Sequence, residues 1–136
     1  MQPPTAVPSG ESLQVRFALC AVDARIRELA NRLRAPLQEW VEPGLGPAVG
    51  FACKLQSGLP LFLEHLLLAP TDIGPIVYVE AATLAQRGVT RLLAEVLPEL
   101  GLAPSSITWR QPDECAQAAK ELAQYSVNRQ RGNNDA

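Results

Sequence analysis

The chain has 136 residues, of which 47% are hydrophobic and 19% charged. This length and composition fit a folded domain with a conventional core and exclude disorder over the whole chain. The net charge of −2 at pH 7 argues against a nucleic-acid partner, because phosphate contacts need a concentrated positive field.

The two ends of the chain differ in composition from the middle. Residues 1–11 are rich in Pro, Ser, Gly and Thr, and residues 128–136 are polar throughout. We expect a flexible leader over 1–11, a single globular domain over 12–127 and a flexible tail over 128–136. The leader lacks the pattern of a secretory signal, and no apolar stretch reaches the length of a membrane span. A cytoplasmic protein with no membrane partner is therefore expected.

The first predicted element is either a strand or the front of a helix, and a helix follows it. Apolar and polar residues alternate over 13–20, which fits a half-buried strand, and the front of a long helix is the alternative. From Asp23 onward the apolar period is helical, with Asp23 as the expected N-cap residue and Pro36 at the expected end or kink. Residues 37–41 are expected to add one more helical turn.

The middle of the chain carries the strongest strand signals. Residues 48–56 and 59–67 are extended apolar runs joined by Ser57-Gly58, and Gly supplies the positive φ that a tight hairpin turn needs. Residues 76–80, IVYVE, predict a further strand.

Helical spacing follows directly after the IVYVE strand. Thr83 and Gln86 match a capping box for this helix, Pro98 is expected to kink or shorten it, and Gly101 occupies the expected C′ position. A short strand over 105–109 would then complete a βαβ unit with residues 76–80.

A last helix begins the C-terminal part, with Asp113 as its expected cap. Together the elements predict an α/β (α+β) fold: one small domain with a mixed sheet of four to five strands, a central hairpin and about three helices.

Residue types that carry chemistry are few. The only histidine, His65, follows Glu64, and on a strand these two side chains point to opposite faces. No residues have the familiar spacing of metal ligands, so neither a metal nor a cofactor is expected. The three cysteines form no C-x-x-C pair and lie in apolar stretches, which predicts reduced core residues; they are Cys20, Cys53 and Cys115.

Acidic residues dominate the middle of the chain. Residues 35–86 contain five carboxylates and one basic residue, Lys54, a bias that would attract a basic partner. Two tryptophans lie near the ends of predicted elements, where large aromatic residues often anchor interfaces. The expected partner-binding residues are Glu39, Trp40, Glu42, Asp72, Glu80 and Trp109.

In size, acidity, element order and scarcity of catalytic residue types, the chain resembles small bacterial binding proteins, namely toxin-immunity proteins and the acidic dimeric chaperones of secreted effectors. The resemblance implies a non-enzymatic protein-binding module that neutralises or escorts a partner such as a basic toxin or a secreted effector.

Two alternatives remain at this point. The first is a small enzyme with a pocket at the end of strand 76–80, in which Glu80 is the base and His65 or Tyr78 assists. The second is a structural homodimer, because the hairpin is apolar on both faces. Glu80 also has a non-catalytic explanation, since a carboxylate next to a helix start is stabilised by the positive end of the helix.

Overall fold

The computed structural model describes residues 15–68 and 73–124. The expected leader 1–11 and tail 128–136 lie outside these residues. Six strands form one sheet in the order β2-β3-β4-β5-β1-β6, and every neighbouring pair is antiparallel. The strands are β1 (Arg16–Val22), β2 (Gln38–Glu42), β3 (Gly46–Lys54), β4 (Pro60–Leu66), β5 (Ile76–Glu80) and β6 (Ile107–Arg110).

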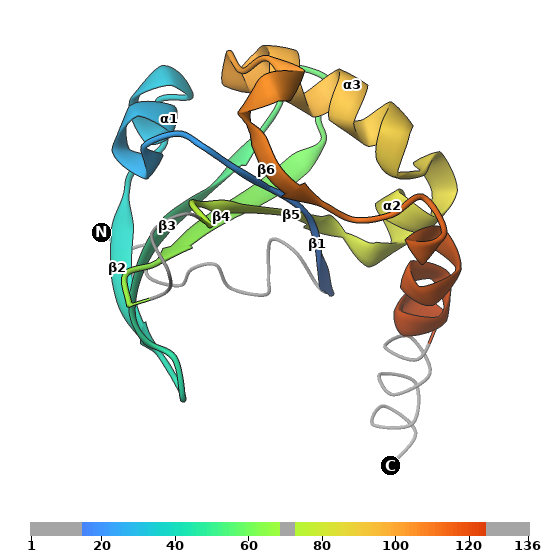
Figure 1. Ribbon diagram of the computed structural model, residues 1–136, viewed down its shortest axis with the longest axis horizontal. Coiled ribbons are helices and arrows are strands. Elements are labelled where there is room, and N and C mark those ends of the chain that lie inside the picture. Colours follow the sequence, from blue (N-terminus) through green and yellow to red (C-terminus); the bar gives the residue numbers. More distant parts are fainter. Residues whose placement is uncertain (1–14, 69–72, 125–136) are drawn as a thin grey trace.

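The helices of the described residues lie mainly on one side of this sheet. Figure 1 shows α1 and α3 above the curved sheet and α2 at one end of it. The helices are α1 (Ile26–Arg32), α2 (Ala81–Arg87), α3 (Val89–Leu100), a short 3₁₀ turn (Pro104–Ser106) and a last helix over residues 115–124.

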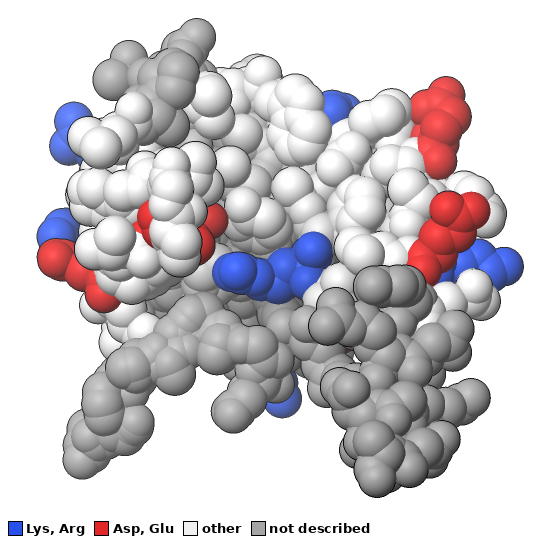
Figure 2. All heavy atoms as spheres, turned by 90° about the horizontal axis from the view of Figure 1, so that it is seen from below, with Lys and Arg blue, Asp and Glu red and all other residues white. Residues whose placement is uncertain are grey.

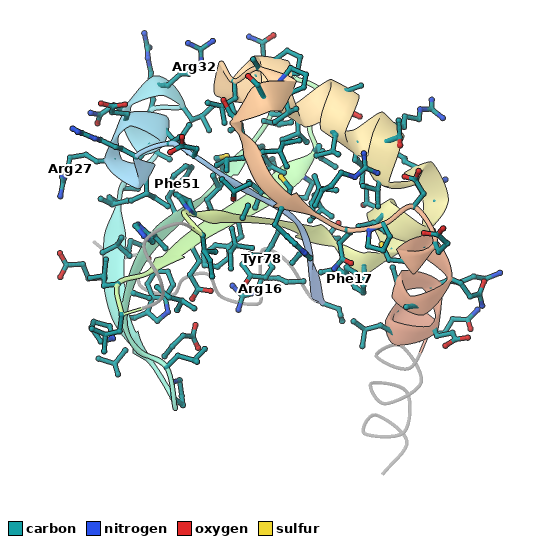
Figure 3. All side chains as sticks on the ribbon, viewed as in Figure 1. Arg16, Phe17, Arg27, Arg32, Phe51 and Tyr78 are labelled. Carbon is teal, nitrogen blue, oxygen red and sulfur yellow. The ribbon has the colours of Figure 1, made fainter. Side chains whose placement is uncertain are left out.

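The main hydrophobic core lies between the sheet and the helices. It joins alternate residues of the strands to the apolar faces of α1, α2 and α3. Phe51 on β3 points toward α1 (Figure 3). The largest fully buried side chains of this core are Leu19, Val22, Phe51, Leu61, Leu63, Val77, Val79, Leu84, Val89, Leu92 and Leu100.

The predicted α+β class and the central hairpin are confirmed, and the sheet differs from prediction in two respects. It has six strands, and it is antiparallel throughout where a mixed sheet was expected. The expected βαβ unit is present in a split form: β5 and β6 run in the same direction but are separated by β1, which pairs with both. The crossover through α2 and α3 therefore spans one intervening strand.

The extra strand is β2, where a helical turn was predicted. Intermediate and exposed side chains alternate along Gln38–Glu42, which is the period of a strand. All five residues pair with β3, from Gln38 opposite Gly50 to Glu42 opposite Gly46. The prediction over 37–41 was wrong because hydrogen bonding to a neighbouring strand decides the conformation of so short a segment. For residues 13–20, the strand is the correct alternative.

Two predicted helix starts were wrong, α1 ends at Arg32, before the expected Pro36, and one predicted helix end was right. Asp23 does not cap α1, which begins after Arg25, and its backbone N–H instead donates to the carbonyl of Ser106. The capping box of Thr83 and Gln86 was also wrong, because α2 begins directly after Glu80. At the other end, α3 continues past Pro98 and ends with Gly101 in the left-handed conformation, φ 75°, as expected.

Further predictions concern Asp113, the hairpin turn and the cysteines. The Asp113 carboxylate accepts hydrogen bonds from Thr90 and Arg110, so it does not cap the helix that begins at residue 115. Gly58 in the β3–β4 turn has φ 92°, as its sequence position predicts. The three cysteines are free, one of them buried and two half-buried.

Among the described helices, none combines the length and hydropathy that crossing a bilayer requires.

Candidate functional site on the open face of the sheet

The face of the sheet turned away from α1 and α3, here called the open face, carries a connected group of aromatic and charged side chains. They come from four strands, and the alternation of each strand turns them to the same side. This aromatic–carboxyl cluster consists of Arg16 (β1), Trp40 and Glu42 (β2), Phe62 and Glu64 (β4) and Tyr78 (β5).

Small residues on β3 allow the cluster to form. Ala48, Gly50 and Ala52 face the same side between β2 and β4, so no large side chain separates the two flanking strands. Trp40 lies across this gap with its ring centroid 5.7 Å from that of Phe62. A Cβ at Gly50 would collide with the Leu63 carbonyl oxygen and lie 2.8 Å from Trp40 Cη2. The contact across β3 therefore depends on glycine at position 50.

A cation stacks on the aromatic side chains. The rings of Phe62 and Tyr78 are 5.8 Å apart, and Arg16 Cζ lies 4.3 Å from the Phe62 centroid and 5.3 Å from the Tyr78 centroid. Figure 3 shows Arg16 and Tyr78 next to each other on the side of the sheet opposite Phe51. A guanidinium over an aromatic face is attracted by the ring quadrupole, so Arg16 covers Phe62 and binds β1 to β4 and β5.

The two carboxyl groups of the cluster face each other. Trp40 Nε1–H donates to Glu42 Oε2 at 3.0 Å, and the Tyr78 hydroxyl donates to Glu64 Oε1 at 3.3 Å. Glu64 is 4% exposed, and its Oε2 has no hydrogen-bond donor in the described residues. The Glu42 carboxyl lies beside that of Glu64, within reach of a hydrogen bond. Because two ionised carboxylates have no proton to donate, such a bond requires a proton between them.

The electrostatics of the cluster assign that proton to Glu64. Burial, followed by the hydrogen bond and the charge of Glu42, raises the pKa of Glu64 to about 7, against smaller opposing effects of Arg16 and Tyr78. The hydrogen bonds from Glu64 and Trp40 lower the pKa of Glu42. Burial and the nearby Glu64 charge raise the pKa of Tyr78 to about 12, so its hydroxyl stays protonated. The pair therefore holds one proton at mildly acidic pH and loses it as the pH rises through about 7.

The predicted partner-binding residues do not form one surface. Trp40 and Glu42 are brought together in the cluster. Glu39 is exposed on the opposite side of β2, and Trp109, 46% exposed, lies on the strand at the other edge of the sheet. Glu80 precedes α2 and lines an open pocket of about 560 Å³ with Lys54 and Pro60. The prediction for Asp72 lies outside the described residues.

The residues of the predicted enzyme pocket are likewise separated. Glu80 lies opposite Arg16 in the β1–β5 register, whereas His65 pairs with Val49 at the other end of β4. The alternation of β4 turns His65 away from the open face. The structure does not bring His65 and Glu80 together, and within the described residues no group of three or more His, Cys, Asp and Glu side chains is arranged to hold a metal ion.

Exposed apolar side chains gather at the end of the β2–β3–β4 meander. The four residues of this hairpin-end patch are between 50% and 74% exposed: Val41, Leu45, Leu67 and Leu68. Val41 pairs with Pro47, whose carbonyl accepts a hydrogen bond from the Leu67 N–H. Leu68 lies against Gly46. These residues therefore lie at one end of three neighbouring strands, and this end of the sheet extends past the helices at the lower left of Figure 1.

The segments that carry this patch contain glutamates and no Lys or Arg. Residues 38–53 and 60–68 include three glutamates and one histidine, and no Lys or Arg. Figure 2, which looks onto the molecule from the side of the open face, shows both red and blue atoms at the left. A patch with an apolar centre and acidic surroundings is complementary to a partner surface that is apolar and basic.

The central residues of the cluster were missed from the sequence. Arg16, Phe62 and Glu64 lie in predicted strands, over residues 13–20 and 59–67, but were not predicted to form a common site. The sequence does contain local indications of the cluster. Alternation along β4 places Phe62 and Glu64 on one face, and β3 carries small residues. Their meeting with Trp40 and Tyr78 depends on strand order and register, which one sequence does not reveal.

Comparison with protein-family models, with curated proteins and with solved structures finds no match to this chain.

Proposed function

We propose that this protein is a non-enzymatic binding module that recognises a basic partner protein through the β2–β3–β4 end of its sheet. The observation that carries the proposal is the hairpin-end patch. Four of the seven large hydrophobic side chains that are exposed in the described residues gather there. Exposed large apolar side chains gathered in one region of a surface often mark an interaction site.

The surroundings of the patch support a basic partner. Glu39 and Glu42 lie on the same short strand as Val41, and no Lys or Arg occurs in the segments that form this end of the sheet. In protein interfaces a desolvated apolar centre supplies most of the affinity, and charges at the rim steer association. A toxin neutralised by an immunity protein, or an effector escorted by a chaperone, is the kind of partner that we propose.

A pull-down with paired variants tests this function. The patch variant is Val41→Ser/Leu68→Ser, and the control is Trp109→Ser/Leu122→Ser, which removes exposed apolar side chains elsewhere. We expect the wild type and the control to retain the same basic protein from host lysate, and the patch variant to bind the purified partner at least about tenfold more weakly. Circular dichroism first verifies that all variants are folded.

Two results would overturn the proposal. The first is that no partner is retained at low salt, and the second is that the patch variant binds as well as the control does. Light scattering distinguishes binding of another protein from the homodimer alternative. If the protein is a homodimer, the wild type and the control variant should be dimers and the patch variant a monomer.

A further inference from the structure

The carboxyl pair of the open face consists of Glu42 and Glu64. Glu64 is buried, and the only hydrogen-bond donor to its carboxylate in the described residues is the Tyr78 hydroxyl, which reaches Oε1. The remaining oxygen needs a donor, and the group beside it is another carboxyl, Glu42. A proton between the two is the simplest occupant that satisfies both.

We propose that the proton shared by Glu42 and Glu64 is a latch that holds the edge strand β2 against the sheet, and that loss of this proton releases β2. The latch continues a chain of hydrogen bonds from Trp40 through Glu42 and Glu64 to Tyr78, and this chain joins β2, β4 and β5 across β3.

β2 is the element most dependent on this chain. It has five residues, lies at the edge of the sheet and pairs with β3 alone. Its side chains Glu39 and Val41 are exposed, so Trp40 and Glu42 supply its main side-chain contacts with the open face. An edge strand pairs with only one neighbouring strand. Its local opening is therefore expected to cost little free energy when its side-chain contacts weaken.

The groups around Glu64 explain why losing the proton has this effect. Glu42 faces it from β2, the Tyr78 hydroxyl from β5 and the Arg16 guanidinium from β1, and β3 contributes only Ala48, Gly50 and Ala52. Arg16 forms no ion pair with either carboxylate among the described residues. A second negative charge would therefore be compensated incompletely in a buried place, and the two carboxylates would repel each other.

The latch would act near neutral pH, because the pKa of Glu64 is raised to about 7. Release of β2 would displace Val41 and the turn residue Leu45, which belong to the hairpin-end patch. That consequence rests on the proposed function: partner affinity should fall as the pH rises toward 7. The latch itself does not depend on any partner.

Amide hydrogen exchange of residues 38–42 in the free, full-length protein tests the latch. After correction for intrinsic exchange, the opening of β2 should increase from pH 5 to about 7, by up to about tenfold per pH unit, and level off above that. Glu64→Gln should remove this dependence, because the amide donates to Glu42 at every pH.

Two control variants sharpen the result. Glu39→Gln changes an exposed carboxylate on the same strand, and His65→Asn replaces the residue that follows Glu64 in the sequence. Both should keep the wild-type pH dependence. The latch is overturned if opening of β2 is independent of pH, if Glu64→Gln retains the dependence, or if His65→Asn abolishes it. Failure to find a partner would affect only the proposed function.

Discussion

Trp40 on β2 and Phe62 on β4 contact each other across an intervening strand, with ring centroids 5.7 Å apart. The contact is possible because β3 presents only small side chains to the open face. It places the indole N–H next to Glu42 and thereby brings Glu42 to Glu64. The small residues of β3 thus determine the geometry of the Glu42–Glu64 pair, although β3 contributes no side chain to that pair.

Gly50→Ala should destabilise the protein by about 1–3 kcal/mol, because the added methyl group has no space beside the Leu63 carbonyl and the Trp40 ring. Urea denaturation followed by circular dichroism measures the loss. A free energy of unfolding within about 0.5 kcal/mol of the wild-type value would show that the contact across β3 contributes little to stability.

Stability should depend on pH through Glu64. Its pKa rises from 4.5 to about 7 on folding, so the folded state binds more protons between these values. The free energy of unfolding should therefore decrease as the pH rises from 5 to 7 and become flat above that. Denaturation of wild type and Glu64→Gln at pH 5, 6, 7 and 8 measures the difference. Glu39→Gln should behave like the wild type, and an equal slope in Glu64→Gln would contradict the assignment.

Removing the positive charge of Arg16 should raise the pKa of Glu64 above about 7, because that charge favours the ionised carboxylate. Arg16→Met keeps a long apolar side chain over Phe62 and isolates the effect of charge. A carbon-detected NMR titration of Glu64 in both proteins provides the comparison. An unchanged or lower pKa in Arg16→Met would show that Arg16 does not act on the carboxyl pair.

Reversing a rim charge should slow partner association. Glu39→Lys is expected to reduce the association rate constant about tenfold at low ionic strength and much less at high salt, since rim charges act mainly through steering. Glu39 is exposed, so the stability of the variant should stay within about 0.5 kcal/mol of the wild type. Stopped-flow binding with the purified partner, with Glu39→Gln as the intermediate case, measures the rate. Equal rates for all three proteins would place the acidic rim outside the interface.

Local patterns in the sequence determined much of the fold. The β3–β4 hairpin, β5 and the end of α3 at Gly101 follow from alternation, turn glycines and helical period, which act over a few residues. The class of the domain follows from the same signals. Trp40 and Glu42 were also identified as candidate site residues, because a tryptophan near the end of a predicted element and an acidic bias are visible without a structure.

Only the tertiary structure decided the rest. Whether residues 38–42 form a helix or a strand depends on pairing with β3, and the split crossover depends on β1 lying between β5 and β6. The meeting of Arg16, Glu42 and Glu64 on one face is set by strand order and register, which join residues far apart in the chain. The chain itself specified side chains and their local period, whereas the proposed shared proton depends on folding, which buries Glu64 beside Glu42.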